Sequence, residues 1–439
     1  TSREVPLIAK VYEDAGINAI SVTGGWHESH VPQLAMELPR GGFAYLARAV
    51  KSAVTIPVIA SNRIADPYLA EQIIKDGDAD MVNLGRVLIA DPFWPEKVQK
   101  GLAEEIRPCV ACSQGCTDEF FSGRPVLCLA NARAGFEGDR NIPVAKTPKK
   151  IMVIGAGPAG LEAACRAAEA GHSVDLYEKR NDIGGQLWIA GTPPHKQELW
   201  EFIRYYDAML AKYNVNLHLE TEVTPELIKN EKPDYIISAE GAEEAIPPIE
   251  GIDGRNVRNA WDVLENDPAL GKKIAIIGGG AVGLETAEFL AEKGTIDPET
   301  LYFLFKYKAE SYERLHELIK TGSKDVTVFE MLPRAGKGVG KSTKWILLGN
   351  IKEHDVKIVT GSKITSVKDN MVTYEKDGEV FSEKFDSIIN AAGSRPVRKI
   401  ADKLEGTGIP FAVIGDSVRP GNILQAVHEG FLAVMNMKF

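Results

Sequence analysis

The sequence predicts an α/β protein in which parallel strands alternate with helices over most of the chain. Three observations carry this prediction. A strand, glycine-rich turn and helix occur twice, as "KKIMVIGAGPAGLEAA" from Lys149 and "KKIAIIGGGAVGLETA" from Lys272. Before residue 105, three short apolar strands each follow a helical segment, and four cysteines fall between these two regions. A chain of 439 residues is expected to form two or three domains.

Composition narrows the class of protein. Hydrophobic residues make up 44% and charged residues 26%, as in ordinary globular chains. A net charge of -10 argues against nucleic acid and anionic membrane surfaces as partners. We see no apolar run near the roughly 18 residues of a spanning helix, and no signal peptide at the start. We therefore expect a cytoplasmic protein whose five cysteines form no disulfide framework and whose clustered cysteines serve metal or redox chemistry.

The N-terminal region, residues 1–105, has the spacing of a βα repeat. The expected strands are 18–25, 56–62 and 78–85, and the helices before them are 3–16, 43–53 and 67–77. A closed barrel needs eight such units and about 250 residues. These units are therefore either the last three of a (β/α)8 barrel without its front or a small open sheet.

The residues after these strands would lie on the C-terminal rim, where barrel enzymes keep their chemistry. Trp26, His27 and Glu28 follow the first strand, although His27 alone could also be a solvated loop residue. Loops after the last two strands of a barrel often hold a phosphate. Arg63, Gly85 and Arg86 follow the second and third strands, and offer charge and close backbone approach.

The cysteine-rich segment, residues 106–148, has the spacing C-x2-C-x3-C-x11-C at Cys109, Cys112, Cys116 and Cys128. Thiolates suit zinc or iron–sulfur clusters. Structural zinc usually takes two paired CxxC knuckles, and only one such pair is present. The asymmetry favours an iron–sulfur cluster, with zinc and unligated thiols as alternatives. Residues 132–148 read as a linker, and Cys165 as a small packing residue.

Both glycine turns match the G-x-G-x-x-G pattern and have the required strand before and helix after. The glycines allow a tight turn and close approach to a pyrophosphate at a helix N-terminus. Glu178 and Glu330 end the next strand of each unit and can accept hydrogen bonds from a ribose. An acidic residue there favours NADH over NADPH, although Arg334 and Lys337 weaken that preference. The six glycines are Gly155, Gly157, Gly160, Gly278, Gly280 and Gly283.

Two units in tandem suggest two different dinucleotides. Asp416 follows a C-terminal strand, and a helix start near Ile423 could face a flavin pyrimidine ring. We therefore expect an FAD-binding domain at 149–245 plus 383–439, with an NAD(P)H-binding domain at 246–382 inserted. Residues 296–324 are extra in the second unit and read as a helical surface excursion, or else as a docking or lid segment.

Together these pieces resemble the 2,4-dienoyl-CoA reductase, 2-enoate reductase and trimethylamine dehydrogenase family. That family joins an Old Yellow Enzyme-like FMN barrel to an FAD/NAD(P) reductase module. The motifs are "GWHE", "NRI", "GR", the cysteine spacing, "GAGPAG", "IGGQL" and "GGGAVG". The resemblance implies that the four cysteines bind a [4Fe-4S] cluster and that His27 polarises a substrate carbonyl. It also implies FMN contacts at Arg63, Gly85 and Arg86, and FAD contacts at Ala159, Glu178, Gly185, Gln186, Val223 and Asp416.

The resemblance implies an NADH-dependent ene-reductase acting on an unsaturated carboxylate, thioester or enone. Electrons would pass from NADH to FAD, to the cluster and to FMN. The barrel would lack its N-terminal part, to be completed on another polypeptide or in a longer chain, and a homo-oligomer is an open alternative. Rival interpretations are an electron-transfer subunit and an amine dehydrogenase, the latter disfavoured by the intact "GGGAVG" and Glu330. Glu240 departs from the family's Ala-Thr-Gly crossover pattern.

Overall fold

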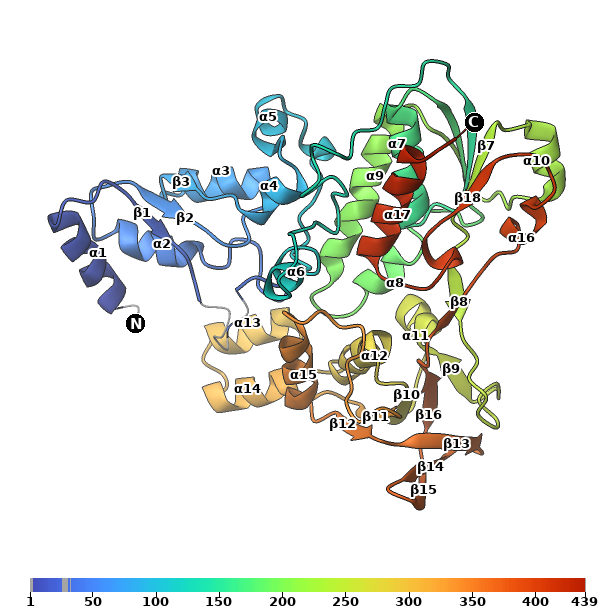
Figure 1. Cartoon of the computed structure of the whole chain (residues 1–439). Coiled ribbons are helices and arrows are strands. Elements are labelled where there is room, and N and C mark those ends of the chain that lie inside the picture. The colour runs from blue at the N-terminus through green and yellow to red at the C-terminus, as the bar shows by residue number, and fades with distance from the viewer. Residues whose placement is uncertain (1–2, 26–30, 32, 439) are drawn as a thin grey trace.

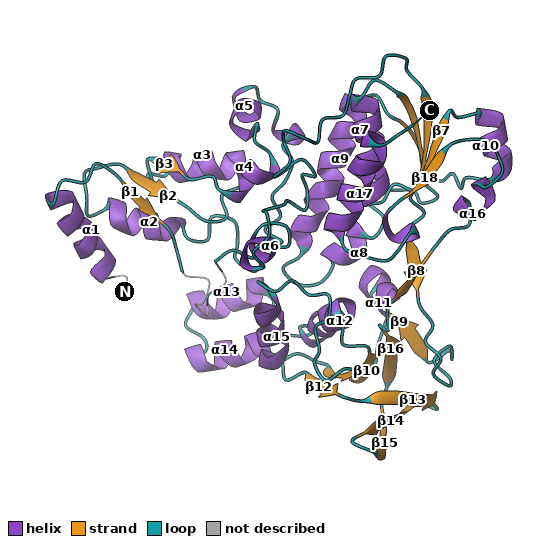
Figure 2. Cartoon of the chain, viewed as in Figure 1, coloured by secondary structure: helices purple, strands orange, loops and turns teal. Residues whose placement is uncertain are grey.

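The computed structural model describes residues 3–25, 31 and 33–438. Figure 1 shows three lobes: the N-terminal helices and strands, an upper sheet domain that also holds the C-terminal helix, and a lower sheet domain. Figure 2 shows that strands in the two larger lobes are flanked by helices. No helix among the described residues is long and apolar enough to cross a bilayer.

The N-terminal lobe is a three-stranded parallel sheet in the order β1-β2-β3. Ile20 pairs with Val58, and Ile59 pairs with Met81. Each strand follows a helix, as the sequence predicts, and the helices bury Ala47 and Val50 against the central strand. The elements are α1 (Glu4–Asp14), β1 (Ile20–Val22), α2 (Ala44–Lys51), β2 (Val58–Ala60), α3 (Pro67–Lys75), β3 (Met81–Val82), α4 (Arg86–Ala90), α5 (Trp94–Gln99) and η1 (Ala103–Glu105).

The upper domain is a five-stranded parallel sheet in the order β18-β7-β4-β5-β6. Its central strand is continuously buried because helices cover both faces. The elements are β4 (Lys150–Ile154), α7 (Pro158–Glu169), β5 (Ser173–Tyr177), α8 (Leu187–Gly191), η2 (Gln197–Trp200), α9 (Glu201–Lys212), β6 (Asn216–His218), α10 (Pro225–Glu231), β7 (Tyr235–Ser238), α16 (Ala401–Leu404), β18 (Phe411–Val413), η3 (Gly415–Ser417) and α17 (Ile423–Met435).

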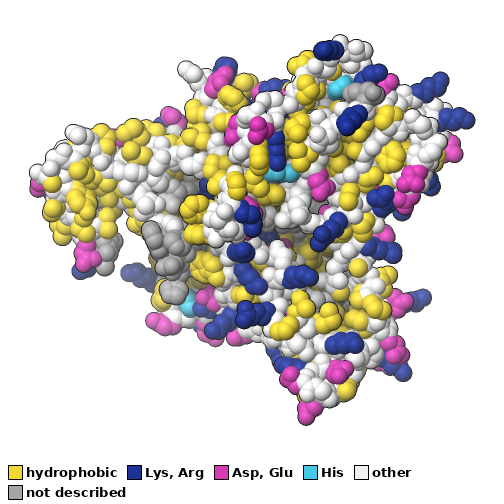
Figure 3. Space-filling model, viewed as in Figure 1, with side chains coloured by type: hydrophobic (Ala, Val, Ile, Leu, Met, Phe, Trp, Pro, Cys, Tyr) yellow, Lys and Arg dark blue, Asp and Glu magenta, His cyan; other side chains and the backbone are white. Residues whose placement is uncertain are grey.

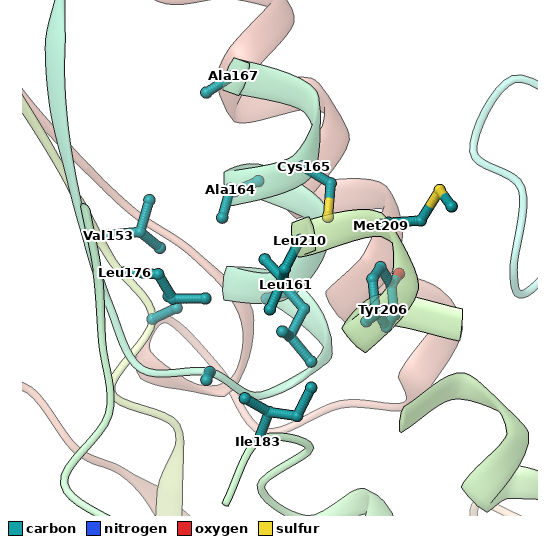
Figure 4. Close-up of a cluster of buried hydrophobic side chains, with 14 of the residues drawn as sticks. Val153, Leu161, Ala164, Cys165, Ala167, Leu176, Ile183, Tyr206, Met209 and Leu210 are labelled. Atoms are coloured by element: carbon teal, nitrogen blue, oxygen red, sulfur yellow. The ribbon is translucent and has the colours of Figure 1, made fainter. Parts of the chain in front are cut away.

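The core of the upper domain accounts for the fifth cysteine. Cys165 is fully buried on α7, and its side chain points toward α9 between Leu161 and Met209 (Figure 4). Burial raises the pKa of this thiol to about 12. Cys165 is therefore a packing residue, as the sequence predicts.

The lower domain is a second parallel sheet, in the order β12-β11-β10-β16-β9, with an antiparallel sheet β13-β14-β15 beside it. Because β16 pairs with β10, the chain leaves this domain only after Asn390, several residues beyond the expected 382/383 boundary. The elements are β9 (Val257–Asn259), α11 (Ala260–Asn266), β10 (Lys273–Ile277), α12 (Ala281–Ala291), α13 (Pro298–Lys306), α14 (Tyr312–Lys320), β11 (Asp325–Glu330), α15 (Lys344–Glu353), β12 (Lys357–Thr360), β13 (Lys363–Lys368), β14 (Met371–Lys376), β15 (Glu379–Lys384) and β16 (Ser387–Asn390).

Two crossing strands, β8 (Ala242–Glu244) and β17 (Ser394–Pro396), pair in antiparallel fashion between the sheet domains. Glu240, which departs from the resembled pattern, precedes this link. Its carboxylate accepts hydrogen bonds from the amides of Ile400 and Ala401, each 2.9 Å away. Glu240 therefore caps the first turn of α16 and has a structural role in the crossover.

The cysteine-rich segment lies between the N-terminal lobe and the upper domain. It contains one short helix, α6 (Thr117–Phe121). Residues 132–148 contain no helix or strand, as expected of a linker. However, Ala132 and Ala134 are buried, so the first part of the linker is packed into the protein.

Candidate functional site

The four clustered cysteines line one cavity. Arg86 and Ile89 of α4 close it on the side of the N-terminal lobe, and residues 108–113, 115–116 and 127–130 form the rest. Gly115 permits the close approach of the two cysteine-bearing stretches, because a Cβ there would lie 2.9 Å from the carbonyl oxygen of Leu127. The sequence spacing therefore folds into a single cysteine-lined site.

Burial and mutual proximity raise the pKa values of Cys109, Cys112 and Cys128. Burial, with a smaller contribution from the nearby Cys109, raises the pKa of Cys128 to about 11. Burial also raises the pKa of Cys112, as do all three of the other cysteines. Burial raises the pKa of Cys109, which the Arg86 guanidinium partly opposes. A metal centre would relieve this by binding the thiolates.

Two kinds of metal centre are compatible with thiolate donors. Within residues 3–25, 31 and 33–438, no group of three His, Cys, Asp or Glu side chains is arranged to hold a single metal ion. Tetrahedral zinc holds its sulfurs at about 2.3 Å and so brings them into mutual contact. A four-iron cluster takes one thiolate at each separate corner.

The cavity also joins two hydrophobic cores. Cys109 packs against the core of the N-terminal lobe, together with Trp94 and Ile106. Cys112 and Cys128 pack against the core of the upper domain. Arg107 holds the cysteine-rich segment together, since its guanidinium donates a hydrogen bond to the carbonyl oxygen of Ala130 at 2.9 Å.

The first glycine turn, between β4 and α7, has the geometry of a phosphate-binding turn. Gly155 has a φ of 96°, and a Cβ there would overlap the carbonyl oxygen of Ala239. A Cβ on Gly160 would overlap the carbonyl oxygen of Gly155. By contrast, a Cβ on Gly157 would meet no atom within 4 Å. The middle glycine thus faces open space at the N-terminus of α7, where a pyrophosphate would lie.

The other expected FAD contacts surround this turn. Glu178 accepts hydrogen bonds from the amides of Ala156 (2.8 Å) and Arg180 (2.9 Å), so its carboxylate lies at the turn. A Cβ on Gly185 would lie 3.1 Å from the Cα of Gly157. Gln186 donates to Asp416 at 3.0 Å across 230 residues of sequence.

Two further expected FAD contacts are buried. Ala159 packs against α17, and Val223 belongs to the same hydrophobic cluster as Tyr177 of β5. The C-terminal helix α17 begins at Ile423, as predicted, with a capping box between Asn422 and Gln425.

The second glycine turn, between β10 and α12, repeats this geometry. Gly278 has a φ of 112°, and a Cβ on Gly283 would overlap the carbonyl oxygen of Gly278. Glu330 accepts hydrogen bonds from the amides of Gly279 (2.9 Å) and Leu332 (2.7 Å). Gly280 differs from its counterpart, because the carbonyl oxygen of Lys337 lies 3.6 Å from where its Cβ would be.

The expected residues of the barrel rim are placed as follows. Gly85 precedes α4 with open space beside it, and Arg86 reaches toward Ser113 at 3.5 Å. Arg63 is buried, and its guanidinium pairs with Glu198 of η2 and donates to the carbonyl oxygen of Leu38 at 2.9 Å. His27, with Trp26 and Glu28, lies outside the described residues.

Three residues that sequence reasoning missed support the site. Asn62 accepts hydrogen bonds from Thr23 and Gly24, each at 2.9 Å, and so fixes the path of the loop after β1. His428 of α17 is buried and hydrogen-bonds the carbonyl oxygen of Cys128 at 2.8 Å. Asp118 of α6 is buried against the lower domain. Only the position of Asn62 before Arg63 in the "SNRI" motif gave a signal in the sequence.

Comparison with known protein families divides the chain in the same way. Residues 149–412 match the model of the pyridine nucleotide-disulphide oxidoreductases. Residues 12–105 match the NADH:flavin oxidoreductase / NADH oxidase family. The N-terminal lobe is therefore part of a flavin oxidoreductase barrel, which decides against an independent open sheet.

Several characterised proteins resemble the chain over nearly its full length. A metal reductase of Desulforamulus reducens is 40% identical over 98% of this chain and 65% of its own length. A bilirubin reductase of Mediterraneibacter gnavus is 34% identical over 98% of this chain and 63% of its own. The solved 2-naphthoyl-CoA reductase complex superposes with a TM-score of 0.89 at 31% identity, covering 100% of this chain and 63% of that one.

The chain thus spans less than two thirds of the length of these relatives. Its order of parts is nevertheless theirs, with barrel strands first and the two glycine turns last. The chain belongs to the pyridine nucleotide-disulphide oxidoreductase family, in the group of flavin oxidoreductases that join this module to an Old Yellow Enzyme-like barrel, as in the 2,4-dienoyl-CoA and 2-enoate reductases.

Proposed function

We propose that the protein containing this chain is an NADH-dependent ene-reductase that reduces the C=C bond of an α,β-unsaturated carboxylate, thioester or enone. The observation that carries this proposal is the bridging position of the cysteine cavity. It contacts the barrel core through Cys109 and the FAD-domain core through Cys112 and Cys128. A site in this place suits single-electron transfer between two flavins. Relatives named for bilirubin and 2-naphthoyl-CoA support a conjugated substrate.

Each cofactor has residues here that fit it. When bound, NADH and FAD would supply hydride transfer, and the [4Fe-4S] cluster between FAD and FMN would supply single-electron steps. The four cysteines, Cys109, Cys112, Cys116 and Cys128, line one cavity, and their asymmetric spacing in the sequence favours the cluster over zinc. Gly157, Glu178 and the Gln186–Asp416 pair would hold FAD. Gly280 and Glu330 would hold the dinucleotide, and the carboxylate favours NADH over NADPH.

The barrel rim would supply the substrate chemistry. Gly85 and Arg86 would contact FMN. Arg63 would also contact FMN once its guanidinium, which is paired with Glu198, is shared with the cofactor or released from that pair. His27 would stabilise the enolate oxygen that forms when hydride reaches the β-carbon, which is a transition-state charge effect. The hydrogen bonds from Thr23 and Gly24 to Asn62 fix the direction of the loop that leads to His27.

A second candidate is an NADH:acceptor reductase that passes electrons from the cluster to an external acceptor. The 40% identical metal reductase favours it, since that name requires no alkene substrate. In this case FAD and iron would be present and FMN would be dispensable.

Anaerobic cofactor analysis of the native protein separates the two candidates. FAD, FMN and about four irons per chain support the ene-reductase. FAD and iron without FMN support the acceptor reductase. An assay of enoate, enoyl-CoA and enone reduction with NADH follows.

A variant at the rim tests the proposed role of His27. His27→Gln is expected to lower alkene reduction by about 100-fold while NADH still bleaches FAD at the wild-type rate. His316→Gln, at an exposed position on α14, serves as the control and should change neither. Equal alkene reduction by His27→Gln and wild type would remove His27 from the mechanism.

A further inference from the structure

Asp118 lies two residues after the ligand Cys116, on the short helix α6. It is charged, yet only 9% of its surface is exposed. Its carboxylate accepts hydrogen bonds from the backbone amides of Ser342 (2.7 Å) and Lys341 (3.1 Å). Both amides belong to the lower domain, more than 220 residues away in sequence.

The lower domain is shaped for this contact. A Cβ on Gly340 would lie 2.7 Å from the Asp118 carboxylate, so glycine lets the loop approach. At the edge of the contact, the Lys341 ammonium donates to the hydroxyl of Ser122 at 3.0 Å. Figure 1 shows α6 where the upper and lower domains and the N-terminal lobe meet.

The loop that contacts Asp118 is also the loop that covers the second glycine turn. It runs from Glu330 to α15, and the Gly336 amide donates to the carbonyl oxygen of Gly279 at 2.7 Å. The Ala281 amide donates to the carbonyl oxygen of Lys337 at 3.0 Å. A displacement at Asp118 is therefore transmitted over a few residues to the expected pyrophosphate site.

A carboxylate that only stabilised its own helix would accept hydrogen bonds from the first-turn amides of α6. No such bond to the Asp118 side chain is present among the described residues, and both of its partners are in the other domain. The geometry instead fits a contact that fixes one domain against another.

We propose that Asp118 is a positioning residue that holds the NADH-binding domain against the iron–sulfur segment and thereby sets the approach of NADH to FAD. The inference rests on the proposed NADH-to-FAD hydride transfer. The other contacts that restrain the lower domain include the β8–β17 link, the contact of α11 with α8 and ion pairs such as Lys196–Glu285. Hydride transfer depends steeply on such alignment, so the contact matters more to the rate than to NADH affinity.

The test uses the complete holoenzyme under anaerobic conditions. Stopped-flow bleaching of FAD by NADH is expected to slow by about 10- to 100-fold in Asp118→Ala, with the NADH half-saturation concentration within about threefold of wild type. Hydrogen exchange at the amides of Lys341 and Ser342 is expected to accelerate. Glu119→Gln is the matched control on the same helix, because the Glu119 carboxylate accepts hydrogen bonds from Arg124 and lies near the Lys341 ammonium, but among the described residues it accepts no hydrogen bond from the lower domain. It should leave both readouts unchanged.

A second variant separates positioning from loss of the cluster. Gly340→Ala pushes the carboxylate away from the lower domain without altering the cysteine segment. It should slow FAD bleaching while iron per chain stays at the wild-type value. The double variant should be no slower than the slower single variant, because both changes remove one contact.

Wild-type bleaching rates in Gly340→Ala, or effects of the two variants that multiply, would overturn the proposal. So would loss of iron in Asp118→Ala with an unchanged bleaching rate. If NADH did not bleach wild-type FAD, the proposed function would fail. Amide exchange at Lys341 and Ser342 would then still decide whether Asp118 holds the domain.

Discussion

At the scale of single residues, the three glycines of the first turn have different physical requirements. Gly155 and Gly160 cannot carry a Cβ because backbone carbonyl oxygens occupy that space. Gly157 has an ordinary extended conformation and faces open space on the cofactor side. Gly155 and Gly160 are therefore needed for folding, and Gly157 for the proposed binding of the cofactor.

Alanine substitutions should separate these requirements. Gly160→Ala is expected to destabilise the apoprotein by about 1–3 kcal/mol or more, because the new methyl group overpacks against backbone. Gly157→Ala should leave apoprotein unfolding within about 0.5 kcal/mol of wild type and weaken FAD binding at least tenfold. Thermal unfolding of apoprotein and FAD titration measure the two effects. Equal loss of stability in both variants would contradict this division.

A buried carboxyl group on α12 predicts a pH effect. The pKa of Glu288 is raised to about 8, mainly by burial. The neighbouring carboxylates of Glu292, Glu37 and Glu285 contribute to this rise, and a hydrogen bond from Asn350 opposes it. The unfolded value is near 4.5, so between these pH values the folded chain holds a proton that the unfolded chain lacks. The contribution of Glu288 to stability therefore falls as pH rises through this window and is constant above it.

Glu288→Gln should remove this loss. The variant is expected to unfold with a free energy about 2–4 kcal/mol higher than wild type at pH 8.5, and the difference should shrink toward pH 5. Denaturant titrations at several pH values measure it. A difference that is independent of pH would show that the carboxyl group ionises normally in the folded chain.

The sequence predicted residues whose role depends on local spacing, and it missed those whose role depends on long-range packing. The glycines and Glu178 follow from one strand–turn–helix unit, and the structure places them together. Asp118 and His428 meet partners more than 200 residues away, and a single sequence holds no signal of such pairs. Arg63 shows the same limit, because the motif predicted its place on the rim but not its pairing with Glu198.

At the scale of elements, helix α17 connects the FAD domain to the cysteine cavity. Its Gly430 packs against the backbone of α7, where a Cβ would overlap the carbonyl oxygen of Ala159. Two residues earlier, His428 hydrogen-bonds the carbonyl oxygen of Cys128, one of the proposed cluster ligands. The helix that would face the flavin thus also fixes the last cysteine.

His428→Leu should loosen that cysteine. A buried carbonyl group left without a donor costs about 1–3 kcal/mol, so chelators should remove iron several-fold faster than from wild type. His428→Gln keeps a donor and should retain most of the protection. Iron release under a fixed chelator concentration measures both. Release that is equally fast in the two variants would argue for ring packing rather than the hydrogen bond.

Most expected elements are present because their signals were strong. The glycine turns and the amphipathic helices of the N-terminal lobe follow from periodicity. The extra segment at 296–324 forms α13 and α14, as its spacing indicated, although α13 buries no residue and exposes Phe303 and Phe305. The antiparallel sheet β13-β14-β15 was not predicted, although the two-residue turns Asp369–Asn370 and Asp377–Gly378 join its strands with positive φ, and Asp-Gly is a strong hairpin signal that the reading of the sequence overlooked.

At the scale of the whole molecule, the parts are arranged around the cysteine segment. On the face shown in Figure 3, lysine and arginine side chains gather over the junction of the two dinucleotide domains, and hydrophobic side chains cover much of the α1 end. That end exposes Leu7 and Val11, at 69% and 64%. The end of the lower domain expected at residue 382 falls short of the observed one, because β16, which comes later in the chain, joins its sheet.

This arrangement predicts that hydride entry and electron exit can be separated by one substitution. On the proposed path, entry from NADH to FAD would use the two sheet domains and the Asp118 contact, whereas the four cysteines would take part only in exit toward the barrel. Cys128→Ala should therefore lose most of its iron and lower alkene reduction at least 100-fold, while FAD stays bound and is bleached by NADH within about threefold of the wild-type rate.

The fifth cysteine provides the matched control for that experiment. Cys165→Ala removes a more deeply buried thiol, in the core beside α7, and should keep iron, FAD and alkene reduction, at a cost of about 1 kcal/mol of stability. Iron analysis, FAD content and the two rates are measured on the same preparations. Alkene reduction that survives in iron-free Cys128→Ala would mean that electrons reach the barrel without the cysteine cavity, and the bridging position would then have a structural role alone.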